Sequence, residues 1–250
     1  MIVVTVLPLQ DGFPCRELSV GFERAESIPA EDGRSAAQAL QAVFPLNDAA
    51  PPGYLRPHLY LSRRPKYTAN YTYQGGNLTY VEKTEQEDRY VKLYIPQTPA
   101  LPALALGVRK KSEGPAALSL FQEAHGLVDV LPQYSLARFD LNGIAEGYPN
   151  NHWLWTFKGG AGYVTGGRLT GVDIEKDALT AAVKKGSMPN EVGVTLEVDE
   201  ATLKVRILTN GKVQFTQFTD EHLVKFEHPE LGNPWPMILH VLQTLKLFQV

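Results

Sequence analysis

The sequence predicts an α+β protein, mostly antiparallel sheets with a few helices, arranged as two sheet-plus-helix subdomains. Three observations support this prediction. Two tight-turn signals, Gly75-Gly76 and Asn210-Gly211, each lie between strand-like runs and predict β-hairpins. Runs of strands are interrupted by few helical segments, a pattern that disfavours alternating βαβ units. Near the end of the chain, four apolar residues recur at helical spacing, namely Ile238, Val241, Leu242 and Leu245.

Composition narrows the class of protein. With 250 residues, 44% of them hydrophobic and 20% charged, the chain has an ordinary globular composition and can bury a substantial core. No run approaches the roughly 20 apolar residues that a membrane-spanning helix needs. The single cysteine, Cys15, excludes an internal disulfide, and the N-terminal stretch predicts a buried strand rather than a signal peptide. We therefore expect a cytoplasmic protein without a membrane partner, and we assign no metal and no cofactor.

The first subdomain is expected to span residues 1–132. Its predicted strands are residues 2–7, 16–24, the two sides of the hairpin around Gly75-Gly76, 89–95, 103–108 and 127–131. Its predicted helices are residues 35–44, which Pro45 would end, and residues 115–124, which Gly126 would cap.

The hairpin around Gly75-Gly76 determines which side chains share a face. A two-residue turn there places Tyr71 opposite Tyr80 and Tyr73 opposite Leu78, so these four side chains lie on one side. Two interpretations are open, because tyrosines on strands can either pack in a core or form a binding surface. The sequence favours packing, since the opposite face of the hairpin carries mainly threonine and asparagine.

The strand predicted at residues 89–95 follows a charged turn predicted at residues 85–88. Its alternation sends three apolar side chains inward, Val91, Leu93 and Ile95, and three polar or aromatic ones outward, Tyr90, Lys92 and Tyr94. The two outward tyrosines are therefore the better candidates for rings that bind a ligand.

The second subdomain is expected to span residues 133–250. Its predicted strands are residues 153–157, 192–198, 203–209 and 212–218. A glycine-rich loop at residues 158–171 precedes a helix predicted at residues 173–185. The last helix should start with Asn233 as its cap and Pro234 at its first position, and we expect it to lie across the second sheet.

Charge is distributed unevenly along the chain. Residues 56–111 contain ten basic and four acidic residues, a net charge of +6, which leaves −9 elsewhere because the whole chain carries −3. Basic residues interleaved with tyrosines are typical of surfaces where bases stack on rings and cations neutralise phosphates. We therefore hypothesise a protein that binds RNA or single-stranded DNA through one cationic surface. The candidate binding residues are Arg63, Arg64, Lys66, Arg89, Tyr90, Lys92 and Tyr94.

Two other functional classes remain open. The chain could be a structural or assembly protein, a homo-oligomer or a subunit of a larger complex, whose basic region meets an acidic partner. It could also be an enzyme whose ligand site includes the loop at residues 159–171, where backbone N–H groups would cradle an anion. The candidate anion-binding residues there are Gly160, Gly162, Gly167 and Arg168. That loop lacks the Lys-Ser/Thr pair of a phosphate-binding loop, and the sequence indicates no catalytic residue.

The C-terminal part resembles the ubiquitin-conjugating fold in the order of its features: a meander, then residues 226–230 (FEHPE), then Trp235 and a Leu-rich helix. The catalytic cysteine that this family places after the His-Pro pair is absent. The resemblance implies at most a non-catalytic relative, and we assign no family from it.

Overall fold

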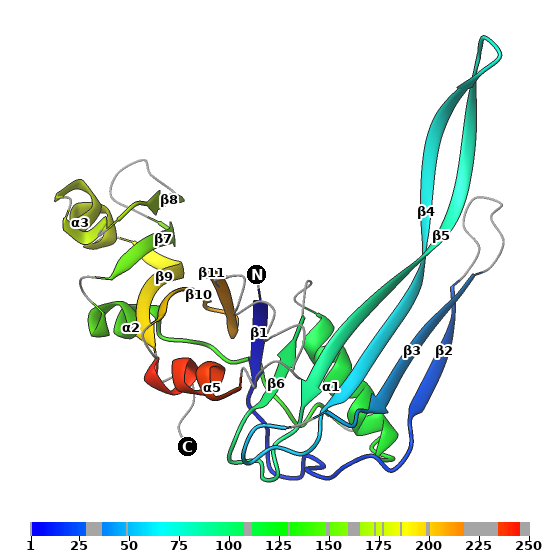
Figure 1. Cartoon of the computed structure of the whole chain (residues 1–250), viewed down its shortest axis with the longest axis horizontal. Helices are drawn as coiled ribbons and strands as arrows, with labels where there is room; N and C mark the ends of the chain where they lie inside the picture. Colours follow the sequence, from blue (N-terminus) through cyan, green and yellow to red (C-terminus); the bar gives the residue numbers. More distant parts are fainter. Residues whose placement is uncertain are drawn as a thin grey trace.

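The computed structural model describes most of the chain (Figure 1). The described residues are 2–28, 37–48, 50–107, 112–129, 131–148, 151–159, 166–172, 174–176, 178–185, 187–198, 201–217 and 235–245. The strands are β1 (Ile2–Leu7), β2 (Phe22–Ile28), β3 (Ala37–Pro45), β4 (His58–Gln74), β5 (Asn77–Tyr94), β6 (Ala103–Leu106), β7 (His152–Lys158), β8 (Gly166–Thr170), β9 (Met188–Val198), β10 (Ala201–Leu208) and β11 (Lys212–Gln217). The helices are α1 (Glu113–Ala124), α2 (Leu141–Gly147), the short 3-10 helix η1 (Ile174–Lys176), α3 (Ala178–Lys185) and α5 (Trp235–Thr244).

The strands form one sheet of eleven, in the order β2-β3-β4-β5-β6-β1-β11-β10-β9-β7-β8. Every neighbouring pair is antiparallel, so the predicted α+β class with antiparallel sheet is confirmed. β1 joins the two parts, because it pairs with β6 on one side and with β11 on the other. We refer to β2–β6 as the N-terminal half-sheet and to β7–β11 as the C-terminal half-sheet.

The two half-sheets bury opposite faces. Helix α1 packs against one face of the N-terminal half-sheet, in a core that includes Tyr60 and Val91. Helices α2 and α5 pack in a second core with residues of the C-terminal half-sheet such as Val205. β6 contributes to both cores, since neighbouring strand residues point to opposite sides: Leu104 lies in the second core and Ala105 in the first. We call the two sides of the sheet the α1 face and the α5 face.

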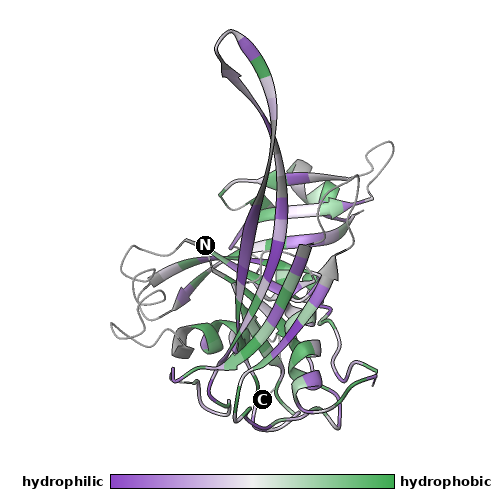
Figure 2. Ribbon diagram, turned by 90° about the vertical axis from the view of Figure 1, so that its right-hand side faces the viewer, coloured by the Kyte–Doolittle hydropathy of each residue, from purple (hydrophilic) through white to green (hydrophobic). Residues whose placement is uncertain are grey.

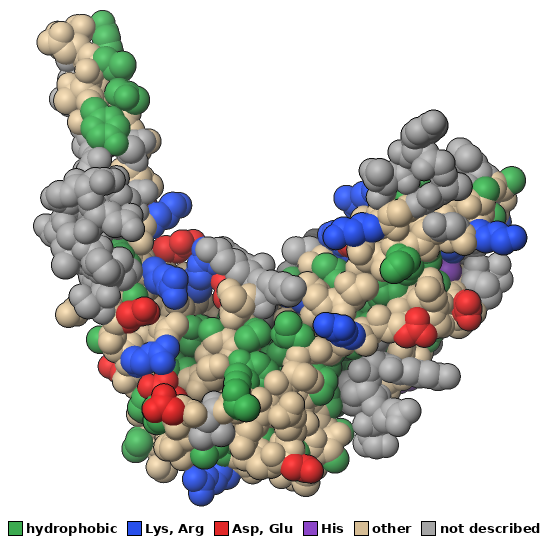
Figure 3. All heavy atoms as spheres, turned by 180° about the vertical axis from the view of Figure 1, so that it is seen from behind, with side chains coloured by type: hydrophobic (Ala, Val, Ile, Leu, Met, Phe, Trp, Pro, Cys, Tyr) green, Lys and Arg blue, Asp and Glu red, His purple; other side chains and the backbone are tan. Residues whose placement is uncertain are grey.

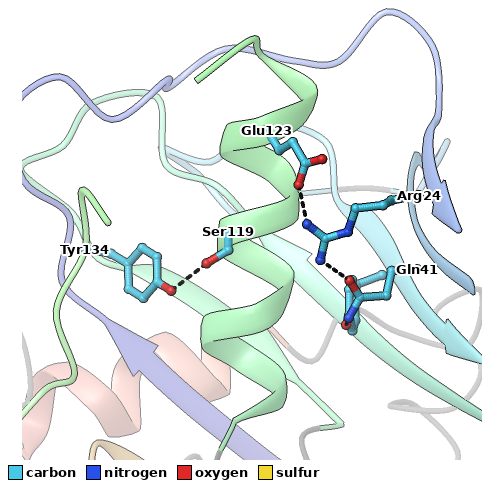
Figure 4. A network of polar contacts seen from close by, with 6 residues as sticks. Arg24, Gln41, Ser119, Glu123 and Tyr134 are labelled. Carbon is cyan, nitrogen blue, oxygen red and sulfur yellow. Dashed lines mark hydrogen bonds and ion pairs between the residues drawn. The ribbon is translucent and has the colours of Figure 1, made fainter. Parts of the chain in front are cut away.

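Polar contacts hold α1 across the strands of the N-terminal edge (Figure 4). Arg24 on β2 forms an ion pair with Glu123 on α1 at 2.7 Å and donates a hydrogen bond to Gln41 on β3. On the other side of the helix, the hydroxyls of Ser119 and Tyr134 are hydrogen-bonded at 2.9 Å. These contacts, added to the apolar core beneath α1, fix which face of the N-terminal half-sheet is covered.

The helix predicted at residues 35–44 is wrong, because residues 37–45 form β3. This strand pairs with β2 on one side and with β4 on the other. Ala39 and Val43 are buried on the α1 face, at the spacing of alternate strand residues. Alanine, leucine and glutamine favour helix intrinsically, but pairing with two neighbouring strands satisfies the backbone and overrides that preference.

The turn predicted at residues 85–88 is also wrong. These residues continue β5, and each is paired with a residue of β4, from Lys66↔Glu85 to Arg63↔Asp88. Cross-strand pairs of opposite charge stabilise a strand that sequence alone marks as a polar turn. Three smaller differences remain. β2 begins at Phe22, later than the strand predicted at residues 16–24. Residues 127–129 and 131 form no strand, and β8 occupies part of the predicted loop at 158–171.

Both predicted hairpins are confirmed. Gly75 and Gly76 have φ angles of 59° and 86°, and Gly211 has 79°, the left-handed values that such turns require. The last helix is confirmed as α5, with Ile238, Val241 and Leu242 fully buried over the C-terminal half-sheet. Its predicted cap, Asn233-Pro234, and the FEHPE stretch lie outside the described residues. The subdomain boundary near residue 132 stays a prediction, and the sheet continues from one half to the other through β1.

Candidate interaction surface

The β4–β5 hairpin extends beyond the body of the protein as an arm (Figures 1 and 2). The pairing of β4 with β3 runs from His58 to Arg63, and the pairing of β5 with β6 covers Lys92 to Tyr94. We define the arm as residues 64–87, whose described strand pairs are with one another alone. At about 3.3 Å per strand residue, each side of the arm spans roughly 36 Å. Among the described residues, the arm is therefore a two-stranded ribbon with no third strand on either edge, and such a ribbon is marginally stable in water by itself.

Four large apolar side chains lie exposed near the tip of this arm. Tyr71, Tyr73, Leu78 and Tyr80 share one face of the ribbon, as the hairpin register predicts. Their exposed fractions are 67%, 73%, 65% and 50%. Figure 3 shows hydrophobic side chains standing on the arm away from the body. The packing interpretation of these residues is therefore wrong, because the hairpin extends beyond any layer that would cover it. We call these four residues the tip.

The same face of the hairpin continues into an apolar surface at its base. No β-bulge interrupts the β4–β5 pairing, so residues ten apart on β4, such as Leu61 and Tyr71, lie on one ribbon face. Leu61 lies opposite Tyr90 on β5, and opposite Ala42 on β3. The apolar strip on this face comprises the half-buried Leu40, Phe44, Leu59 and Leu61 and the exposed Tyr90.

The strip lies on the α5 face of the N-terminal half-sheet, opposite the side covered by α1. None of its five residues belongs to either of the two cores among the described residues. Sequence reasoning missed most of it. The only local signal is the alternation of Leu59 and Leu61 in β4, which indicates a face but does not indicate whether that face is covered.

The predicted cationic residues do not form one surface. Arg63, Lys92, Tyr90 and Tyr94 point to the α5 face, whereas Arg64, Lys66 and Arg89 point to the α1 face. Tyr94 lies in the second core with 3% of its surface exposed, so its ring is not available to a ligand. Sequence alternation correctly placed Tyr94 beside Tyr90 and Lys92 but could not show that the C-terminal half covers it.

Carboxylates pair with the cations at the base of the arm. Arg63 donates two hydrogen bonds to Asp88, both of 2.8 Å. The hydrogen bonds from Arg63 hold the pKa of Asp88 below its usual range. Tyr90 donates a further hydrogen bond to the same carboxylate at 3.1 Å. The other ion pairs join Lys92 to Asp48 at 2.6 Å, and Arg89 to Glu113 at 2.7 Å and to Glu87 at 2.9 Å.

Two further cations, Arg64 and Lys66, are exposed on the arm and stand opposite Glu87 and Glu85 across the strand pair. The excess of +6 already counts Glu85, Glu87 and Asp88, and the fold brings two further carboxylates, Asp48 and Glu113, alongside Lys92 and Arg89 from outside residues 56–111. A polyanion would have to compete with these carboxylates for the same guanidinium and ammonium groups.

The candidate anion-binding loop is in part an edge strand. Gly160 and Gly162 lie outside the described residues, whereas Gly167 and Arg168 belong to β8. A Cβ at Gly167 would lie 2.9 Å from the ring of Phe157, so this glycine allows β8 to approach β7 closely. Arg168 lies near Arg206, whose pKa is lowered by burial and by the charge of Arg168.

Comparison with known proteins adds no family, since the sequence matches no protein-family model and no curated protein. In the described part of the chain, no helix combines the length and the apolar character needed to span a membrane. The interpretation of the arm therefore rests on its own geometry.

Proposed function

We propose that this chain is an assembly protein, and that its arm binds a second copy of the chain to form a homodimer. The observation that carries this proposal is the exposed tip. Its three tyrosines and one leucine protrude from a ribbon none of whose described side chains belongs to either core. Contiguous exposed aromatic and aliphatic residues on a protruding element are typical of protein interaction sites.

The same chain also offers a surface that matches the tip. The strip of Leu40, Phe44, Leu59, Leu61 and Tyr90 is apolar and lies on a sheet face that no described helix covers. A two-fold axis lets the tip of each copy pack on the strip of the other, so that one symmetric contact covers both apolar surfaces. This self-complementarity favours a second copy over an unrelated partner.

The area available suits a dimer of this kind. At about 200 Å² per tyrosine, the three tip rings together expose roughly 400 Å² at their observed exposed fractions. Two reciprocal arms, each covering an equal area on its partner, would bury about 1,600 Å², which is the size of a standard specific interface.

The binding of single-stranded nucleic acid is the second candidate function. Exposed tyrosine rings can stack on bases, and each stacked base contributes about 1–3 kcal/mol. The tip supplies rings on which bases could stack. The cations needed to bind phosphates are less available, because Arg63, Arg89 and Lys92 are already paired with carboxylates. We therefore treat nucleic-acid binding as an alternative outcome of the test.

Sedimentation velocity at several protein concentrations tests the proposal. The tip variant replaces Tyr71, Tyr73, Leu78 and Tyr80 with threonine, which keeps the strand preference of the ribbon. The matched control replaces Asn70, Thr72 and Thr79 on the opposite ribbon face with serine. We expect the unmodified protein and the control to form dimers as concentration rises, and the tip variant to stay monomeric.

A complementation experiment identifies the receiving surface. The strip variant Leu59→Thr/Leu61→Thr keeps an intact tip, and the tip variant keeps an intact strip. Each alone should be monomeric, whereas a mixture of the two should form a heterodimer held by one tip–strip contact.

An unmodified protein that is monomeric at every concentration would overturn the proposal. If that monomer binds oligothymidine with an affinity that falls steeply with salt and is lost in the tip variant, the arm is a nucleic-acid site instead.

A further inference from the structure

A second feature of the chain lies in the C-terminal half, remote from the tip. A cavity of about 400 Å³ opens between α2 and α3 over β7. His152 and Trp155 of β7 are both 2% exposed and form its floor, while α2 contributes Asn142 and Glu146 and α3 contributes Lys184 and Lys185 to its walls. This volume lies within the range of small-molecule sites in proteins.

The polar groups of this cavity are held in a fixed arrangement. Lys184 Nζ lies 3.1 Å from His152 Nδ1 and 4.6 Å from the centre of the Trp155 ring. An ammonium donates and never accepts, so Nδ1 accepts this hydrogen bond and the imidazole carries its proton on Nε2. The Trp155 indole N–H donates to Ser187 Oγ at 3.3 Å, which fixes the ring plane. A positive charge is thereby positioned above an aromatic floor.

We propose that this cavity binds a small organic anion with a flat apolar body, such as an aromatic monocarboxylate. The carboxylate would meet Lys184, since an ammonium with three N–H donors can bind an anion while it keeps its contact with the imidazole. The flat body would stack on Trp155 between Ala145 and Ala181, the small residues on the two walls.

The opposite wall sets a limit on the charge of the ligand. Glu146 lines the cavity together with Asn142, so a second negative charge on the ligand would face a carboxylate. A neutral polar substituent, in contrast, could hydrogen-bond to the Asn142 amide. This arrangement selects monoanions over dianions of similar shape, and it is independent of whether the arm forms a dimer.

Isothermal titration calorimetry with 2-naphthoate as the probe tests this site. The unmodified protein should bind 2-naphthoate and should bind the uncharged analogue 2-naphthalenemethanol about tenfold more weakly, the loss expected for one charge-assisted hydrogen bond. Lys184→Gln should weaken 2-naphthoate binding by a similar factor and leave binding of the uncharged analogue unchanged. Lys158→Gln, the matched control on an exposed lysine of β7 outside the cavity lining, should leave binding of both probes unchanged.

Two further measurements keep the test decisive. The tip variant should bind 2-naphthoate like the unmodified protein, which separates this cavity from the apolar surface of the arm. If Lys184→Gln fails to fold, Trp155→Phe should still weaken binding of both probes, because it removes part of the aromatic floor. No binding of 2-naphthoate to the unmodified protein, or equal binding by Lys184→Gln, would overturn the proposal.

Discussion

The sheet has two open faces, and they differ in character. On the C-terminal half-sheet, no described helix packs on the α1 face, which carries half-buried polar residues such as Thr195, Arg206 and Gln214 in alternation with the buried Val194 and its neighbours. This is the usual pattern of an antiparallel sheet with one side in water.

On the N-terminal half-sheet, the α5 face carries the apolar strip and, beyond the Arg63–Asp88 ion pair, the exposed tip. One open face thus has the composition of a solvent surface and the other has that of an interface. Because both faces belong to the same sheet in the same chain, the difference cannot be ascribed to overall composition. This contrast is the reason for the proposal that a second copy of the chain covers the strip.

The largest expected change in the free energy of unfolding comes from truncating phenylalanines on the two faces of the N-terminal half-sheet. Phe121 of α1 is fully buried on the α1 face, whereas Phe44 of β3 is half-buried in the strip. Phe121→Ala should lower the free energy of unfolding by about 3–5 kcal/mol, and Phe44→Ala by about 1 kcal/mol. Urea unfolding in the tip-variant background measures both without a contribution from dimerisation. Equal losses would show that the strip is covered within the monomer.

The covered face should also confer a pH dependence. His58 is fully buried against Phe121, with ring centres 5.0 Å apart, and burial lowers its pKa from 6.5 to about 4. The unfolded chain therefore binds a proton first as the pH falls. Stability present above pH 6.5 should decline towards pH 4, by up to roughly 3 kcal/mol. Urea unfolding across this range should show the decline, and His58→Gln should reduce it.

Deleting the arm tests whether dimerisation requires the arm while folding does not. A variant in which Asn-Gly joins Arg64 to Glu87 keeps every strand pair of the body. Because the described strand pairs of the arm lie within the arm, we expect the free energy of unfolding to change by about 1 kcal/mol or less. Dimerisation should be lost completely in sedimentation velocity. A body that no longer folds would show that the arm stabilises its own chain.

The smallest effect is expected on the polar open face. Thr195→Ala should change the free energy of unfolding by about 0.5 kcal/mol or less and leave the sedimentation profile unchanged. Leu61→Ala, the corresponding truncation on the strip, should instead weaken dimerisation. If Thr195→Ala impairs assembly as much as Leu61→Ala does, the contrast between the two open faces is not functional.

Much of the local structure could be predicted from the sequence. The hairpin at Gly75-Gly76 and its register followed from the glycines, and the alternation of Val91, Leu93 and Ile95 correctly placed them on one face. The candidate interaction surface could be predicted only in part. Which tyrosines share a face was predictable, but their exposure was not, because exposure depends on where the rest of the sheet ends.

By itself, the sequence determined the two hairpin turns, the alternation of residues 91–95 and the buried side of α5, since each depends on residues close together in the chain. The tertiary structure decided that residues 37–45 are a strand, that Tyr94 is buried while Tyr71 is exposed, and that Arg63 and Lys92 meet carboxylates. It also brought His152 beside Lys184. Burial and charge pairing depend on which distant segments come together, and local pattern does not encode that information.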